Sequence, residues 1–136
     1  MNGIIVQARA TSTRFPNKIF SKVMGKTAIC HVIDQCLKSN AGCVVLAIPS
    51  QQRDLFFPYV NEYFKNERFK LHCGSESNVI KRFFDASRSF SLETVIRITS
   101  DCFAINPRMI DSCLNFYENN DYDYINNSTV NRVLSE

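Results

Sequence analysis

The 136-residue sequence predicts an α/β fold: a Rossmann-like, mostly parallel sheet of about five strands with flanking helices. Short, continuous apolar runs alternate with segments whose apolar residues recur every three or four positions, which is typical of βαβ units. Several runs are apolar at successive positions, as in strands that helices cover on both faces. No internal repeat or linker interrupts this pattern, so we expect one domain over residues 1–136.

The first predicted strand covers residues 3–8, because the run GIIVQA is apolar at almost every position. A polar, basic loop then leads to a helix whose apolar side chains share one face: Ile29, Val32, Ile33, Cys36 and Leu37. Thr27 is placed to cap the start of this helix, and Asn40-Ala41-Gly42 is placed to end it.

The middle of the chain predicts two more strands with a helix between them. Residues 43–48 (CVVLAI) form a second continuous apolar run, which Pro49-Ser50 closes. Residues 55–64 favour a helix, and Pro58 must begin or kink it because proline has no amide hydrogen to donate. Residues 69–73 are predicted to form a short third strand.

The helix after the third strand is predicted to begin at a Ser77 cap. Its apolar residues are expected on the inner side: Val79, Ile80, Phe83, Phe84 and Phe90. Residues 94–99 (TVIRIT), rich in β-branched side chains, then form the fourth strand.

The last predicted helix has Asn106 as its cap and Pro107 at its first position, the placement that proline prefers. Its buried stripe is expected to contain Met109, Ile110, Cys113, Leu114 and Tyr117. Residues 122–125 complete the pattern as a fifth strand.

Composition excludes several classes of function. Lys and Arg number 16 against 13 Asp and Glu, a net charge of +3, which is too mild to indicate nucleic-acid binding. No apolar run approaches the roughly 18 residues that a membrane span needs. The opening segment also lacks the pattern of a signal peptide, so we expect a cytoplasmic protein without membrane insertion.

The six cysteines are scattered along the sequence, with no CxxC pair and no zinc-like spacing to a histidine. Four of them stand inside apolar stretches, where a free thiol packs like a small hydrophobic side chain. We therefore expect reduced, structural cysteines, as in a reducing compartment.

The loop after the first strand concentrates positive charge. Arg9, Arg14 and Lys18 are interleaved with the hydroxyl residues of 11–13, and no acidic residue offsets them. Cations, hydroxyls and backbone amides on one turn make an anion site, most naturally for a polyphosphate. The loop matches neither of the common glycine-rich phosphate motifs, and its composition alone is equally compatible with a solvated basic loop.

Other polar residues follow the third and fourth strands, at the edge where ligands of such sheets bind. Asp101 is placed either to bind Mg²⁺ opposite a polyphosphate or simply to cap a turn. Arg97 points into the same crevice or forms an ion pair on a half-buried face. Gly74-Ser75 forms a tight turn with free amides, and Glu76-Ser77 is compatible with plain helix capping.

The sequence IIVQARATSTRFPNK resembles the opening signature of the cytidylyltransferase family that makes CMP-activated acidic sugars. It is most similar to the spore-coat polysaccharide branch, which typically reads Q-A-R-x-x-S-T-R-x-P-x-K, and is also similar to the acylneuraminate and KDO enzymes. The likeness spans essentially the whole chain, as the N-terminal portion of such an enzyme. It continues through these segments: Gly25-Lys26, His31-Val32-Ile33, VVLAIPS at 44–50, Gly74-Ser75-Glu76, Val79-Ile80 with Arg82, VIRITSDC at 95–102, Asn106-Pro107, Tyr124 and Asn126-Asn127.

This resemblance implies that a sugar hydroxyl attacks the α-phosphate of CTP and that pyrophosphate leaves, with Mg²⁺ bridging phosphates. It implies that three cations hold the triphosphate: Arg9, Arg14 and Lys18. Ser12 and the loop backbone from Ala8 would lie beside them, and Asp101 would be the metal ligand. It places four further residues near the nucleotide: Gly74, Ser75, Arg82 and Arg97. Basic residues with Mg²⁺ suit phosphoryl-type transfer, which needs positioning and charge stabilisation more than a nucleophilic side chain.

The chain departs from the family pattern in several places. A glycine that is common in the first loop is Thr11 here, and two carboxylates near the crevice are replaced by the amides of Asn78 and Asn106. Family members also run well beyond 200 residues, and their second half carries sugar-binding residues and a second acidic metal ligand. The resemblance therefore leaves two hypotheses: a cytidylyltransferase that transfers CMP to a sugar for surface polysaccharides, or a catalytically inactive nucleotide-binding or assembly protein. Open strand edges also lead us to expect a homodimer.

Overall fold

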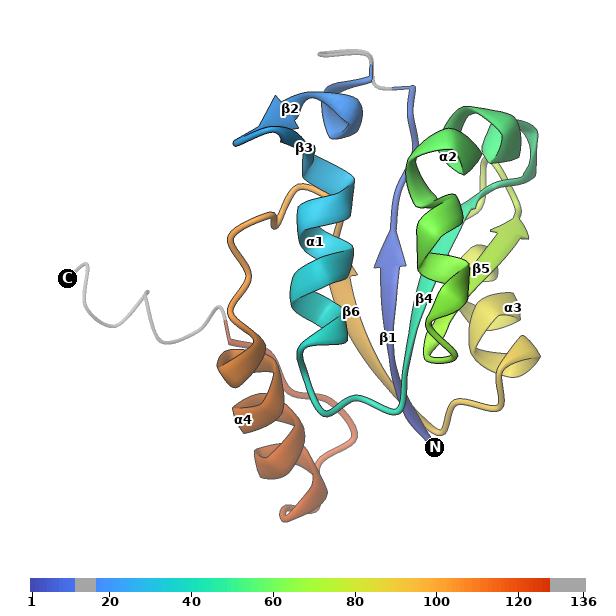
Figure 1. Cartoon of the computed structure of the whole chain (residues 1–136). Helices are drawn as coiled ribbons and strands as arrows, with labels where there is room; N and C mark the ends of the chain where they lie inside the picture. The colour runs from blue at the N-terminus through green and yellow to red at the C-terminus, as the bar shows by residue number, and fades with distance from the viewer. Residues whose placement is uncertain (12–16, 128–136) are drawn as a thin grey trace, which may run out of the picture.

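The computed structural model describes residues 1–11 and 17–127, which form an α/β sandwich around a parallel sheet (Figure 1). Within these residues the sheet has four strands in the order β5-β4-β1-β6. The strands are β1 (Asn2–Gln7), β4 (Cys43–Pro49), β5 (Phe69–Gly74) and β6 (Thr94–Thr99). All pairings are parallel. The α/β fold class and the four strand positions are therefore as predicted.

Helices cover both faces of the sheet. One face carries α1 (Ala28–Leu37), α2 (Arg53–Val60) and α4 (Pro107–Glu118), whose apolar residues join one core cluster with β1 and β4. The other face carries α3 (Val79–Ser89), which packs against Val45 and Ala47 of β4. All seven residues of β4 are buried, because this strand has neighbours on both edges and helices on both faces.

The remaining elements are short. A two-stranded antiparallel hairpin, β2 (Lys22–Val23) and β3 (Lys26–Thr27), precedes α1. Three 3₁₀ segments cover Lys18–Phe20, Ser50–Gln52 and Asn61–Lys65. No helix in the described part of the chain is long and apolar enough to cross a membrane.

The prediction of a fifth strand at residues 122–125 is wrong, since the structure has no strand there. Three of these four residues are exposed, and only Ile125 is partly buried. The ring of Tyr122 stacks on Phe116 of α4, with ring centroids 5.9 Å apart. The segment thus packs along the helix rather than in the hydrogen-bonded ladder that would make it a strand.

The prediction for α3 is wrong in two respects. Its cap is Asn78, whose side chain accepts a hydrogen bond from the Lys81 amide at 2.9 Å, and not Ser77. Ile80 is 82% exposed and Phe84 58% exposed, although both were expected inside. The residues that this helix buries fully are Arg82 and Ala86, with Phe83 and Phe90 packed beside Ala86. Two sets of residues recur at helical spacing on this helix. Packing against β4 buries the set that contains Arg82 and Ala86 and leaves Ile80 and Phe84 exposed.

The other helix predictions hold better. Asn106 caps α4 by accepting from the Arg108 amide at 2.9 Å, and Pro107 takes the first helical position. Thr27 occupies the cap position of α1, but its side chain makes no capping hydrogen bond there. Pro58 lies inside α2 rather than at its start, and the helix passes into a 3₁₀ segment soon after it. In the stripe of α4, Ile110 and Leu114 are buried but Met109 is 47% exposed.

The six cysteines, all within the described residues, are free thiols, as expected. Cys30, Cys36 and Cys43 are buried, whereas Cys102 is exposed. Burial raises the pKa of the Cys36 thiol to about 12, so this side chain stays protonated at neutral pH. These buried thiols act as small apolar core residues.

Candidate functional site

The candidate site lies where the strands end, at the carboxyl edge of the sheet. The loop after β1 is held there by its backbone. The Ala8 amide donates to the Ala47 carbonyl at 3.1 Å, and the Asn17 amide donates to the Ala10 carbonyl at 2.8 Å. The last contact closes the loop on itself, so its two described ends, residues 8–11 and 17–18, lie close together.

A buried glutamine that the sequence analysis missed braces this loop. Gln52 is 4% exposed, its Oε1 accepts from the Ala10 amide at 2.6 Å, and its Nε2 donates to Thr11 Oγ1 at 3.0 Å. Thr11 replaces a glycine common in the family, and this contact gives the hydroxyl a structural use. Its position in the sequence could have identified this residue, because Gln52 follows β4 at the same edge of the sheet as the loop.

Asp101 faces the basic loop, as the strand order predicts. The Lys18 Nζ lies 3.8 Å from Asp101 Oδ2, and both side chains are about half exposed. Asp101 stands in a turn that the Cys102 amide closes on the Thr99 carbonyl at 3.2 Å. Its carboxylate is thus directed to the cation of another loop, at a place that water and a ligand can reach.

The turn after β5 holds a buried guanidinium. Arg82 is fully buried, and its Nη1 donates to the Ser75 carbonyl and, at 3.5 Å, to the Glu76 carbonyl. Its Nε and Nη2 have no hydrogen-bond partner among the described residues. Leaving charged donors unpaired away from water costs free energy, so these groups are suited to bind an anion.

The positive charges of two arginines interact at this edge. Burial lowers the pKa of Arg82, and the positive charge of Arg9 lowers it further. Arg9 itself is exposed and lies two residues after the last residue of β1. Like charges gathered at one place repel each other, and an anion bound between them would remove that repulsion.

His72 on β5 lies next to Arg82 and was also missed. Its Nε2 is buried and has no hydrogen-bond partner within residues 1–11 and 17–127. A Cβ built on Gly74 would lie 2.8 Å from this atom and 3.1 Å from Arg82 Cγ, so only glycine fits between the two side chains. Burial lowers the pKa of His72, and the nearby charges of Arg82 and Lys81 act in the same direction against Asp85. A histidine inside a strand carries no sequence signal that marks it as part of a site.

This lowered pKa predicts acid-sensitive stability. The unfolded chain binds a proton at His72 near the ordinary pKa of 6.5, while the folded chain resists it. The free energy of unfolding should therefore fall as the pH drops below about 6.5, and part of this fall should vanish in His72→Gln. Urea unfolding at about pH 7.5 and pH 5.5 measures the difference. His31→Gln serves as the control that keeps His72, and an unchanged pH difference in His72→Gln would contradict this assignment.

The other residues from the sequence analysis are placed as follows. Ser75 Oγ accepts from the Asn78 amide at 3.2 Å, which shapes the turn into α3. Arg97 lies in β6 before its carboxyl end, with its guanidinium 5.8 Å from the ring centroid of Phe83. The structure thus pairs Arg97 with an aromatic ring rather than with a described carboxylate. Ser12 and Arg14 lie outside the described residues.

Comparisons with known proteins identify the family of this chain. A cytidylyltransferase family model matches residues 3–136. A Bacillus subtilis protein, spore coat polysaccharide biosynthesis protein SpsF, is 26% identical over 140 residues, covering 96% of this chain and 57% of the relative. The 3-deoxy-manno-octulosonate cytidylyltransferase of Chlamydia trachomatis is 31% identical over 119 residues, covering 85% of this chain and 45% of the relative.

Solved structures show the same likeness. A cytidylyltransferase from Leptospira borgpetersenii superposes with a TM-score of 0.79 at 25% identity, over 88% of this chain and 50% of that one. A CMP-2-keto-3-deoxy-manno-octonic acid synthetase complexed with CTP has the same fold, with a TM-score of 0.73 at 19% identity. The chain spans about half the length of the relatives it matches. From the family match over nearly all its residues, the chain belongs to the cytidylyltransferase family.

Proposed function

We propose that the chain binds the triphosphate of CTP at the carboxyl edge of its sheet and serves a cytoplasmic nucleotidyltransferase that transfers CMP to a sugar for surface polysaccharides. One observation carries the proposal: the buried guanidinium of Arg82, with two unpaired donor groups, beside the positive charge of Arg9. The family membership and the names of the relatives indicate CTP as the nucleotide.

The chemistry asks for positioning and for stabilisation of negative charge. In the proposed reaction a sugar hydroxyl attacks the α-phosphate and pyrophosphate leaves, so negative charge spreads over the phosphate oxygens. In this proposal Arg9, Lys18 and Arg82 are the fixed cations that hold those oxygens, and preorganised donors act without reorganisation during the reaction. A site of this kind needs no nucleophilic side chain.

Mg²⁺ fits this site as an ion that arrives with the nucleotide. The described residues contain no cluster of three side chains that could hold a metal ion by themselves. Asp101 offers a single exposed carboxylate beside Lys18, and Mg²⁺ in nucleotide sites often takes one protein carboxylate and completes its shell with phosphate and water. When bound, Mg²⁺ would neutralise part of the phosphate charge.

Calorimetric titration tests the nucleotide proposal. We expect CTP to bind more tightly with Mg²⁺ than with a chelator, and we expect Asp101→Asn to remove most of that difference because it removes the carboxylate ligand. Lys18→Ala should weaken binding about 10-fold, the worth of one charge-assisted contact. Asp121→Asn, another exposed aspartate, is the matched control. Absence of CTP binding at millimolar concentration would refute the proposal.

Asn78 and Asn106, which replace two carboxylates of the family pattern and cap α3 and α4, favour a second candidate: a nucleotide-binding or assembly protein without activity of its own. Pyrophosphate release from CTP and candidate acidic sugars separates the two. Release that depends on Asp101 supports the enzyme. If the fully folded chain binds CTP but no pyrophosphate is released, the second candidate is supported.

A further inference from the structure

The side-chain amide of Gln52 has a fixed orientation. This residue ends the 3₁₀ segment after β4 and is buried. The backbone amide of Ala10 can only donate, so the Gln52 atom that faces it at 2.6 Å must be the carbonyl oxygen, Oε1. The Gln52 Nε2 therefore faces Thr11 Oγ1, at 3.0 Å. The protein backbone thus determines which end of the glutamine amide meets the threonine.

This orientation determines what the Thr11 hydroxyl can do. A hydroxyl has one hydrogen to donate and two lone pairs that accept, whereas an amide nitrogen only donates. Thr11 Oγ1 therefore accepts from Gln52 and keeps its own hydrogen for another acceptor. Thr11 is exposed and follows the buried Ala10. Its hydroxyl is thus a donor that a buried residue orients, at a position that a ligand can reach.

Gln52 also holds the two described ends of the loop after β1. The Ala10 amide donates to Gln52, and the Ala10 carbonyl accepts from the Asn17 amide at 2.8 Å. Asn17 has a φ of 59°, in the left-handed region that asparagine tolerates better than most residues. Lys18 follows directly and begins a 3₁₀ segment. The place of Lys18 therefore depends on Ala10, and through Ala10 on Gln52.

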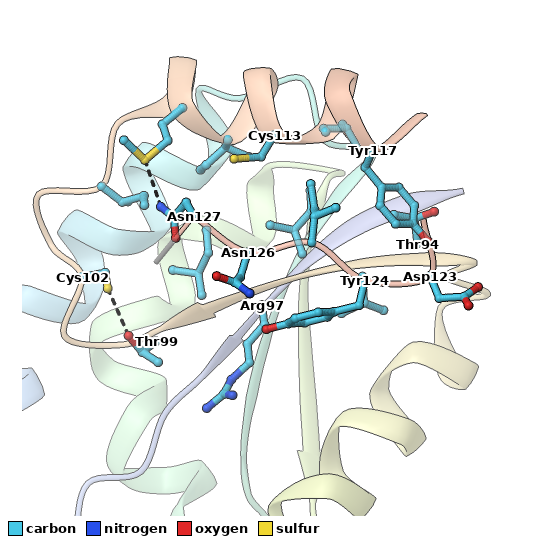
Figure 2. A pocket seen from close by; sticks show the side chains of 18 of the residues that line it. Thr94, Arg97, Thr99, Cys102, Cys113, Tyr117, Asp123, Tyr124, Asn126 and Asn127 are labelled. Carbon is cyan, nitrogen blue, oxygen red and sulfur yellow. Dashed lines mark hydrogen bonds between the residues drawn. The ribbon is translucent and has the colours of Figure 1, made fainter. Parts of the chain in front are cut away.

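The carboxylate that faces Lys18 is also held in place. Lys18 Nζ lies 3.8 Å from Asp101 Oδ2. In the turn that contains Asp101, Cys102 Sγ lies 3.0 Å from Thr99 Oγ1, a contact that Figure 2 shows. Local contacts thus fix both partners of this ion pair before any ligand is present. Groups that are already in position need less ordering when a ligand binds, which favours affinity.

We propose that Gln52 is a positioning residue for the nucleotide: it presents the Thr11 hydroxyl as a donor to a phosphate oxygen and fixes the loop that carries Lys18. This inference deepens the proposed function and rests on it. A hydrogen bond to a charged phosphate oxygen is stronger than one between neutral groups. The glycine that is common at this position in the family has no side chain to donate, so the contact belongs to this chain's own sequence.

Gln52→Glu tests the orientation with little change of shape. An ionised carboxylate accepts from both the Ala10 amide and the Thr11 hydroxyl, so the hydroxyl hydrogen is no longer available to the nucleotide. A protonated carboxyl group donates to Thr11 as glutamine does. At about pH 8 we expect Gln52→Glu to bind CTP about 10-fold more weakly than the parent, and we expect this ratio to shrink toward about pH 5.5.

Gln51→Glu is the matched control, because Gln51 is an exposed neighbour in the same 3₁₀ segment. It adds the same charge without the contact to Thr11, so its affinity relative to the parent should not change with pH. Comparing each variant with the parent at the same pH removes the titration of the nucleotide itself. Calorimetric titration gives the affinities, and urea unfolding shows that each protein is folded.

A second comparison changes only the exposed partner. Thr11→Ser keeps a hydroxyl and Thr11→Val removes it, so the valine variant should bind CTP about 10-fold more weakly than the serine variant. Gln52→Met and Thr11→Val remove the same contact, and their losses should therefore be less than additive when the two changes are combined. The Thr11 variants decide the question if Gln52→Glu does not fold.

Two outcomes would overturn the role of Gln52 while the proposed function stands. In the first, the parent binds CTP, but the ratio for Gln52→Glu is the same at both pH values. In the second, the serine and valine variants at position 11 bind CTP equally well. A parent chain that does not bind CTP at all would instead refute the proposed function, and the role of Gln52 would fall with it.

Discussion

Replacing Arg82 with methionine is expected to weaken CTP binding about 100-fold or more without unfolding the protein. The variant keeps a long apolar stem but removes two unpaired donors and a buried positive charge. Charge-assisted hydrogen bonds contribute about 1.5–3 kcal/mol each, and 1.4 kcal/mol is a factor of ten in affinity. Two such bonds to a bound anion therefore account for the expected loss.

Stability separates this role from a purely structural one. Arg82 donates from Nη1 to the Ser75 and Glu76 carbonyls, so its removal loses these contacts. It also removes the cost of a buried, incompletely paired charge, and replacing such charges by apolar side chains is often neutral or stabilising. We expect the free energy of unfolding of Arg82→Met to fall by no more than about 1 kcal/mol.

The matched control is Arg88→Met on the same helix, where the arginine is exposed and lies over the ring of Phe84. It should change neither CTP affinity nor stability appreciably. Calorimetric titration and urea unfolding of the three proteins provide the readouts. If Arg82→Met unfolds the chain, or binds CTP as tightly as the parent, then Arg82 serves the fold and not the nucleotide.

Replacing Leu46 with alanine is expected to cost the largest amount of stability, about 2–5 kcal/mol. Leu46 is fully buried in β4, the strand with helices on both faces and strands on both edges. The substitution removes buried methyl groups and leaves a cavity that the surrounding strands cannot easily fill. Such a loss is a large fraction of the stability of a small domain.

Leu55→Ala is the control, since Leu55 is 50% exposed on α2. Its cost should stay near about 0.5 kcal/mol, as for most surface positions. The free energies of unfolding of the two variants are compared from urea unfolding curves that have equal slopes. Equal costs for the two leucines would contradict the assignment of β4 as the centre of the core.

Several features of the site followed from the sequence because parallel strands end at one edge. The apolar runs of β1, β4, β5 and β6 located the strands, and the residues after them were then expected to meet. Lys18 and Asp101 do so, at 3.8 Å. Gln52 and His72 were missed, because their importance depends on burial and on neighbours from other elements.

The sequence by itself determined the fold class, the four strands and the cap of α4, since these depend on local composition and periodicity. Only the tertiary structure decided which stripe of α3 faces the sheet, and it buried Arg82 rather than Ile80. Only the tertiary structure likewise left residues 122–125 outside the sheet. The physical reason is the same in both cases. A periodic pattern in the sequence indicates which residues can share a helix face or form a strand, but contacts with distant residues determine which surface is buried and which edge is paired.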